Sequence, residues 1–466
     1  MKTTIRFYSG LDTIGAVIME VKYGKNRAFF EAGTAFNPSF DMFDGLVDKR
    51  KSIVKDYLWI NEIPNINYIY RKEDISGLDL KPACDYDGNQ AFFISHLHLD
   101  HMRMMGLIDP SIPVYLTENA QTIEFAQENA GIGVDSIRGH QYSDMQEDTY
   151  VGDIHVHRFI LNDDSYQDLS FYIETPDLKL HYTGDIFVYG KYFNNIQNEI
   201  KYLNEKDIDI LIPEGTTFWS NFDDTREITP TFTPYSLLSK DEQQDKLINI
   251  IKDYQGLVVF NCYEREMSDV MELTDIAQKT SRTLVFEPIS AYIINRFFNK
   301  SVNYIIPDTY KDEPDYLKYV KQNNTLINKS DIIVNPDKYL VQNTYANILE
   351  LLDYRDLNLL YLHYAGQPIG DFDPKYKTMM NLINSLGFDF MGRSRFEDGT
   401  FFSSHATPEQ LLAYQDAIKC KLIIPLHTAN RTAYCKYIKK PYFWANLNET
   451  YEYDKENNTM KVVEYE

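Results

Sequence analysis

The sequence has few cysteines, and no two of them are close together. Cys84, Cys262, Cys420 and Cys435 are the only four in 466 residues. Cysteines that are scattered and form no C-x-x-C pair argue against both a disulfide framework and a cysteine zinc site. We therefore expect reduced cysteines whose side chains pack in the folded chain.

Long apolar runs are also missing. No run of roughly 18 apolar residues occurs, so the sequence predicts no membrane-spanning helix. The first residues, Met1 to Phe7, lead into a strand-like segment and lack the apolar core of a signal peptide. We expect neither membrane insertion nor export, and hence a cytoplasmic protein.

Positive charge is scarce. Lys and Arg number 46 against 69 Asp and Glu, which gives a net charge of −23. This balance disfavours non-specific adhesion to nucleic acid and slows encounter with any polyanion. A groove lined with metal ions can still be locally positive inside an acidic protein. The 44% of hydrophobic residues is ample for large cores and predicts a globular chain.

Residue types that bind metal cluster in the sequence directly after one predicted strand. Ala91 to Ser95 is typical of a buried strand, and it is followed at once by His96, His98, Asp100 and His101. In extended backbone, residues two apart point the same way, so His96 and His98 can face one ion while Asp100 and His101 turn towards a second. The spacing predicts a two-metal site at a strand's end. The alternative is a polar loop whose histidines bind nothing.

Other segments carry simpler predictions. Val114 to Leu116 indicates a strand, followed by a helix that Thr117 caps and Gly131 ends after Ala130. His155 and His157 share one face of a predicted strand and could bind metal as a pair. Because no carboxylate is beside them in the sequence, we interpret them as part of an exposed or stacked strand face. Residues 37 to 89 show little periodicity and are interpreted as a surface excursion.

The motif Ser95-His96-Leu97-His98-Leu99-Asp100-His101 resembles the second signature motif of the metallo-β-lactamase fold. Glu31-Ala32-Gly33 is similar to the first motif, and Thr183-Gly184-Asp185 is similar to the fourth, whose Asp bridges two ions. Where the family has a third-motif histidine, this chain has Asp163, followed by Asp164. An oxygen ligand there would favour harder ions such as Mn²⁺.

Three later segments resemble motifs of the β-CASP branch of this superfamily, which includes ribonuclease J and the mRNA 3′-end processing endonuclease. Ile208 to Thr216 is similar to motif A, Ser403-Ser404-His405-Ala406 to motif B, and Leu422 to Thr428 to motif C. The resemblance implies that Glu214 orients a histidine ligand, and that His405 contacts a scissile phosphate beside Ser403 and Ser404. It also implies that His427 joins Asp100, His101 and Asp185 as a ligand of the second ion.

The fold class follows from where the motifs stand. From residue 240 the chain alternates helices and strands in the β-α-β pattern of a parallel sheet, and metal motifs flank this block on both sides. We predict an α/β (α+β) protein: an αββα metallo-β-lactamase domain of residues 1–231 and 403–466, interrupted by a β-CASP domain of residues 232–402.

The function that the resemblance implies is phosphodiester hydrolysis, with RNA processing as its most specific form. Two divalent ions, Zn²⁺ or alternatively Mn²⁺, would be held by His96, His98, Asp100, His101, Asp163, Asp185 and His427. His405, Asp100 and Glu214 would be catalytic. Two other hypotheses stay open: a scaffold or regulatory protein with a degraded metal site, and a metallohydrolase of a substrate other than nucleic acid. A membrane partner is not expected, and the choice between monomer and homodimer is open.

Overall fold

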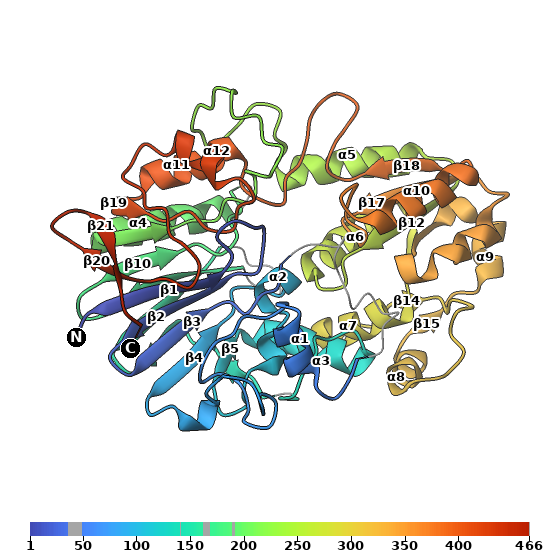
Figure 1. Ribbon diagram of the computed structural model, residues 1–466. Helices are drawn as coiled ribbons and strands as arrows, with labels where there is room; N and C mark the ends of the chain where they lie inside the picture. The colour runs from blue at the N-terminus through green and yellow to red at the C-terminus, as the bar shows by residue number, and fades with distance from the viewer. Residues whose placement is uncertain (36–48, 140, 162–167, 189–191, 466) are drawn as a thin grey trace.

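The computed structural model describes residues 1–35, 49–139, 141–161, 168–188 and 192–465. Over these residues the chain forms two facing mixed sheets with helices outside them, and a third, parallel sheet beside them (Figure 1). We call the two facing sheets and their helices the sandwich, and residues 240–392 the inserted part.

The first sheet of the sandwich brings the two ends of the chain together. In the described residues it has eight strands in the order β21-β20-β1-β2-β3-β4-β5-β6. The strands β21 to β3 are antiparallel, whereas β3 to β6 run parallel. Their bounds are β1 Thr3–Ser9, β2 Ile18–Tyr23, β3 Asn26–Phe30, β4 Asn89–Phe93, β5 Val114–Leu116, β6 Ser143–Asp144, β20 Thr450–Asp454 and β21 Thr459–Val463.

The second sheet faces the first. Its six described strands have the order β19-β11-β10-β9-β8-β7, of which β19, β11 and β10 are parallel and the rest antiparallel. They are β7 Asp148–Val151, β8 Ile154–Ile160, β9 Leu169–Glu174, β10 Lys179–Tyr182, β11 Ile208–Ile212 and β19 Cys420–Ile423.

The core between the two sheets is rich in phenylalanine. Phe30 of β3 stacks on Phe93 of β4 at 5.4 Å between ring centroids, and it meets Phe171 of β9 from the opposite sheet at 5.5 Å. All three rings are fully buried. Each such burial stabilises the fold by about 1.5–3 kcal/mol. This core fixes the edge where the strands end and the metal-binding residues begin.

Helices cover both outer faces, which makes the sandwich four-layered. On the first sheet lie α1 Ile53–Trp59, α2 Leu99–Met102 and α3 Glu118–Ala130, with the short 3-10 segments η2 Ala83–Asp85 and η3 Met105–Leu107. On the second sheet lie α4 Phe193–Lys206, α11 Pro408–Ala417 and α12 Arg431–Tyr437. The helix α3 has the predicted bounds: Thr117 Oγ1 accepts a hydrogen bond from the Ala120 amide, and Gly131 ends the helix at φ 81°.

The inserted part contains the third sheet, whose described strands are all parallel in the order β15-β14-β13-β16-β12-β17-β18. They are β12 Leu257–Cys262, β13 Thr283–Phe286, β14 Asn303–Tyr304, β15 Thr325–Leu326, β16 Tyr339–Gln342, β17 Leu359–Tyr364 and β18 Asp389–Gly392. The helices are α5 Lys240–Asp253, α6 Met267–Lys279, α7 Pro288–Phe298, α8 Asp315–Asn323, α9 Lys329–Val334 and α10 Pro374–Ser385, with the 3-10 segments η5 Pro336–Lys338 and η6 Tyr345–Tyr354.

The sandwich and the inserted part share one hydrophobic core. The helix α3 packs against α7, and both can be followed side by side in Figure 1. Buried residues from the sandwich, such as Ile123, belong to the same cluster as Phe260 and Ala291 of the inserted part. The two parts are therefore docked through apolar contacts as well as linked by the chain.

Two predictions from the sequence are wrong in this region. Residues 49–89 are not a surface excursion, because Val54, Tyr57 and Ile66 are buried in that same cluster. His155 and His157 also have a carboxylate beside them: Asp148 Oδ1 from the adjacent strand lies 2.6 and 3.0 Å from their ring nitrogens. The expected stacking is present, since Tyr150 covers His155 and Tyr202 covers His157.

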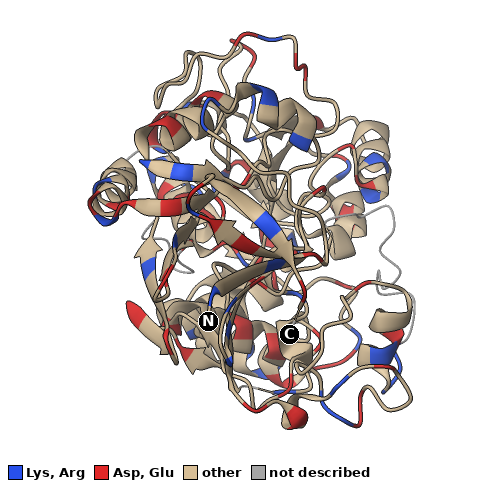
Figure 2. Cartoon of the chain, turned by 60° about the vertical axis from the view of Figure 1, so that its left-hand side comes forward, with Lys and Arg blue, Asp and Glu red and all other residues tan. Residues whose placement is uncertain are grey.

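The predicted fold class is confirmed: the chain is an α/β (α+β) protein with an αββα sandwich and an inserted α/β part. The proposed boundaries, 1–231 with 403–466 and 232–402, stay a prediction. In the described chain, no helix is long and apolar enough to cross a membrane. Figure 2 shows Asp and Glu spread over many elements, with Lys and Arg dispersed between them and not gathered into one stripe.

Candidate metal centre

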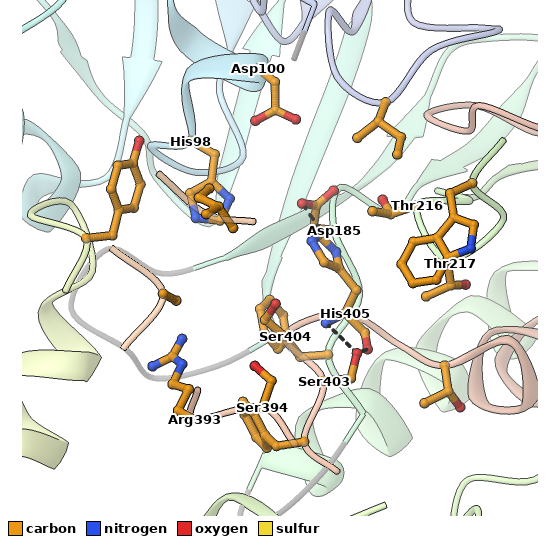
Figure 3. A pocket seen from close by; sticks show the side chains of 18 of the residues that line it. His98, Asp100, Asp185, Thr216, Thr217, Arg393, Ser394, Ser403, Ser404 and His405 are labelled. Carbon is orange, nitrogen blue, oxygen red and sulfur yellow. Dashed lines mark hydrogen bonds and ion pairs between the residues drawn. The ribbon is translucent and has the colours of Figure 1, made fainter. Parts of the chain in front are cut away.

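A large pocket opens between the sandwich and the inserted part. Its volume is about 1100 Å³, and residues of both parts line it (Figure 3). The close-up shows His98, Asp100 and Asp185 in its upper part, His405 next to Asp185, and Ser394, Ser403 and Ser404 below them. A site here can hold a substrate between two walls that come from distant segments of the chain.

Parallel strands explain why these distant residues meet. The strands β3 and β4 are parallel, and so are β10, β11 and β19, so each set ends at one edge of its sheet. The loop that carries His96 follows β4, Asp185 follows β10, Thr216 follows β11 and His427 follows β19. The carboxyl ends of parallel strands are where side chains from separate segments converge.

Close backbone approach holds the loops in place. A Cβ on Gly33 would lie 1.6 Å from the Asp100 carbonyl oxygen, and one on Gly184 would lie 2.4 Å from the Leu169 carbonyl oxygen, where φ is also +55°. Only glycine fits these two positions. His427 itself adopts φ +55°, a strained conformation for a side chain other than glycine.

The first cluster consists of His96, His98 and Asp185. His96 Nε2 lies 2.9 Å from His98 Nδ1 and 3.5 Å from Asp185 Oδ2. These atoms lie close enough to one another to hold an ion. His96 and Asp185 are buried, and His98 is at the pocket wall.

The second cluster consists of Asp100, His101 and His427, with the other oxygen of Asp185. His101 Nε2 lies 3.1 Å from His427 Nε2 and 3.3 Å from Asp185 Oδ1. Asp100 Oδ2 is 3.3 Å from His427 Nε2 and 3.8 Å from His101 Nε2. Asp185 thus presents one oxygen to each cluster, and the two clusters are adjacent.

The donors fit divalent ions. Neighbouring ligands of a tetrahedral ion with bonds of about 2.0 Å are roughly 3.3 Å apart, and the separations in both clusters scatter around this value. Asp185 Oδ1 is buried and accepts no hydrogen bond from the described residues, although His101 Nε2 is near. A buried oxygen without a donor is costly unless a cation satisfies it.

The outer nitrogen of each imidazole faces an oxygen. Ser95 Oγ is 2.8 Å from His96 Nδ1, Thr216 Oγ1 is 2.8 Å from His427 Nδ1, and Glu266 Oε1 is 2.9 Å from His98 Nε2. Glu31 Oε1 lies 3.3 Å from His101 Nδ1. Such partners fix which nitrogen carries the proton and turn the other towards the ion.

The charges of the centre favour ionised carboxylates. Burial alone would raise the pKa of Asp185, but the neighbouring His101 and His427 hold that pKa well below its usual range. Burial would also raise the pKa of Asp100, but His101 and His427 outweigh burial and lower that pKa. Burial and the neighbouring imidazoles His101 and His98 lower the pKa of His96 well below its usual range, so His96 is a neutral donor. Neutral imidazoles and ionised carboxylates are the forms that bind metal.

His405 lies beside the clusters, next to Asp185. Its Nδ1 is buried, has no hydrogen-bond partner in the described chain, and lies 3.7 Å from both Asp185 Oδ2 and Glu214 Oε2. Burial lowers its pKa, but the carboxylates of Asp185 and Glu214 outweigh burial and raise the pKa to about 9. Ser403 Oγ donates to the His405 carbonyl at 2.7 Å, and Ser404 lines the pocket.

Glu214 was expected to contact a histidine ligand, but it accepts hydrogen bonds from backbone amides instead. Its carboxylate accepts hydrogen bonds from the Ile186 and Thr216 amides at 2.7 and 3.2 Å, while Thr216 takes the place beside His427. Glu214 still has an oxygen within 4.8 Å of donor atoms of Asp185 and His427. Asp163 and Asp164, expected to replace the third-motif histidine, lie outside the described residues.

Two residues of the centre escaped the sequence analysis. Thr216 was seen only as part of motif A, and Glu266 was not singled out. The signal available for both was their place: Thr216 comes four residues after β11, and Glu266 four residues after β12. Polar residues just past the carboxyl ends of parallel strands are candidates for a site at that edge.

Comparisons with known proteins define the fold and leave the activity open. Neither a protein-family model nor a curated protein matches the chain. A crystal structure of a protein of unknown function from Enterococcus faecalis V583 is similar, with 23% identity over 97% of this chain and 99% of that one, and a TM-score of 0.74. Two metallo-β-lactamases, BJP-1 of Bradyrhizobium japonicum and MIM-2, match at 10% and 13% identity over 45% and 46% of this chain and 76% and 72% of theirs. Both have a TM-score of 0.26, which is too low to bear on this chain.

Proposed function

We propose that the chain is a two-metal hydrolase of phosphodiesters, with RNA as the first substrate to test. One observation carries the proposal: both oxygens of Asp185 face separate imidazole clusters, and His405 stands beside them on a substrate-sized pocket. His96, His98 and Asp185 would hold one ion, and Asp100, His101, His427 and Asp185 the other. Two divalent ions, Zn²⁺ or Mn²⁺, would supply positive charge for a phosphoryl oxygen and lower the pKa of a water molecule towards neutrality.

The residues of this chain would divide the remaining work. His405 faces the pocket beside Asp185 and Glu214, so it is the group placed to protonate a leaving oxygen, a role worth roughly 10²–10⁴-fold. Ser403 Oγ donates a hydrogen bond to the His405 carbonyl, and Glu214 Oε2 lies 3.7 Å from Nδ1 of His405. Asp185 and Asp100 stay ionised and would bind the ions.

Two positively charged side chains of the pocket support the proposal of an anionic substrate. The side chains of Lys375 and Arg395 line it without a carboxylate partner among the described residues. A polyanion groove would be expected to carry more such charge. The described lining has six Lys and Arg against eight Asp and Glu, which favours a second candidate, a metallohydrolase of a smaller or uncharged substrate.

The test is turnover of a 5′-monophosphorylated labelled RNA with Zn²⁺ or Mn²⁺, compared between the wild type and His405→Ala. We expect His405→Ala to lose phosphodiester hydrolysis by at least about 10²-fold, with bound metal per chain and melting temperature nearly unchanged. Ser394→Ala, at another point of the pocket wall, is the matched control and should keep most of the turnover.

Three outcomes separate the hypotheses. Wild-type turnover by His405→Ala would remove His405 from the mechanism. Two bound ions with no RNA cleavage, but with cleavage of a small ester or phosphodiester, would favour the smaller substrate. A chain that binds no divalent ion by elemental analysis would favour the scaffold hypothesis.

A further inference from the structure

A loop of the inserted part enters the metal centre. Residues Tyr263 to Glu266 follow β12, and Tyr263 and Glu266 line the pocket. Glu266 Oε1 lies 2.9 Å from His98 Nε2, and the Tyr263 ring lies 5.9 Å from the His98 ring between centroids. His98 therefore meets side chains from a segment more than 160 residues away.

The two nitrogens of His98 have different neighbours. Nδ1 lies 2.9 Å from His96 Nε2, inside the first cluster, whereas Nε2 faces Glu266. A neutral imidazole carries its proton on one nitrogen, and a carboxylate stabilises the tautomer whose N–H points at it. Glu266 thus favours the proton on Nε2 and leaves the lone pair of Nδ1 towards the cluster. Because it lies beyond the far side of the ring, Glu266 is not itself a ligand of that cluster.

The loop is fixed to the sandwich. Arg265 Nη1 donates to Glu124 Oε2 of α3 at 2.7 Å, and its Nη2 donates to the Ile132 carbonyl at 3.1 Å. Gln127 of the same helix donates to the Glu264 carbonyl at 3.3 Å. Arg265 is 5% exposed and Glu124 fully buried, so this ion pair is shielded from water. The position of Glu266 at His98 therefore depends on how the inserted part docks on α3.

The outer nitrogen of His98 faces a residue of the inserted part, which distinguishes His98 from the other imidazoles of the centre. The described oxygens beside the outer nitrogens of His96, His101 and His427 belong to Ser95, Glu31 and Thr216, all in the sandwich. We propose that Glu266 is a positioning residue of the metal centre and makes the inserted part a component of the first cluster. The inference rests on the proposed metal binding, and it predicts that separation of the two parts weakens the first cluster before the second.

The test measures metal affinity and does not depend on turnover. Zn²⁺ binding to the full chain is titrated against a chromophoric chelator, and the Co²⁺ form is followed by its visible absorption spectrum. In Glu266→Ala, one of the two ions should bind about 10–100-fold more weakly, with a changed Co²⁺ spectrum. The other ion should keep its affinity. Glu266→Gln retains an oxygen acceptor and should recover most of the loss, and Glu264→Gln, in the same loop, should match the wild type.

Two results would overturn the inference. One is wild-type affinity for both ions in Glu266→Ala. The other is an equal loss of both ions together with a lower melting temperature of the metal-free chain, because that pattern shows a general folding role. If the wild type binds two ions but cleaves no phosphodiester, the proposed function fails while the affinity comparison still decides the role of Glu266. A wild type that binds no ion would overturn both.

Discussion

Asp185 joins the two clusters, because its carboxylate oxygens face different imidazoles. No other described carboxylate has this position between His96 on one side and His101 on the other. Loss of one of its oxygens should therefore affect both ions, whereas Asp100 contacts only the second cluster.

We expect Asp185→Asn to lose both ions and Asp100→Asn to lose one. An amide keeps one neutral oxygen and cannot bridge two cations, so both affinities fall. After dialysis, elemental analysis should give close to no metal per chain for Asp185→Asn and close to one ion for Asp100→Asn. Two retained ions in Asp185→Asn would show that Asp185 does not bridge.

Residue types and their positions after strands were enough to predict which residues form the metal centre. They were not enough to predict which residues contact the outer nitrogens of its imidazoles. His96, His98, Asp100 and His101 are near in sequence, and each lies where an ion would need it. The contact between His98 and Glu266 depends on docking of the inserted part, which no local pattern encodes. Whether Asp163 contributes stays a prediction.

At the scale of elements, α3 was predictable and the segment before β4 was not. A threonine cap and a glycine stop define α3 without help from the rest of the fold. In residues 49–89, the buried side chains of the short helix α1 (Val54, Tyr57 and Leu58) have helical spacing, whereas most of the others fill space over the first sheet in irregular backbone. Packing of this kind is decided by tertiary contacts and leaves no periodic signal.

The helix α3 should also make stability depend on pH. Burial, and the charge of Glu124 one turn away, raise the pKa of Glu128 to about 7. A carboxyl group with a raised pKa in the folded state contributes stability below its unfolded pKa, and that contribution is lost as the pH rises through about 7. Glu128→Gln removes this loss, so its melting temperature should exceed that of the wild type by more at pH 8.5 than at pH 5.5.

The matched control for this prediction is Glu118→Gln, which removes one charge from the exposed first turn of the same helix. A negative charge there is favourable to the helix, so the control should not raise the melting temperature. Equal gains by both variants, measured by calorimetry at both pH values, would assign the effect to the net charge of the chain instead of to Glu128.

At the scale of the whole molecule, the resemblance of the motifs implied the four-layered sandwich, and the position of the motifs on both sides of a β-α-β block predicted that an α/β part interrupts it. The exact boundaries stay predictions, and so does the oligomeric state. The shared core of α3 and α7 was not predictable, because it joins apolar faces from two parts of the chain that no sequence pattern pairs.

Metal ions should stabilise the whole fold. The second cluster joins the loop after β4 of the first sheet to His427 after β19 of the second, so a bound ion ties the two sheets together. A site filled at 100 times its dissociation constant adds about 2.7 kcal/mol. Removal of metal with EDTA should lower the melting temperature by several degrees, and Zn²⁺ should restore it. An unchanged melting temperature, with loss of metal verified by elemental analysis, would contradict this expectation.

The pairing of β1 with β20 has a consequence for how the chain is made. On the ribosome, β1 is synthesised long before β20, so one edge of β1 finds its partner only when residues 450–454 have been synthesised. The edge of β11 likewise waits for β19, and with it for His427. An open strand edge invites pairing with other chains. Translation must therefore pass residue 420 before β11 can pair with β19, and residue 450 before β1 can pair with β20. A nascent chain stalled before residue 420 would expose both unpaired edges to other chains.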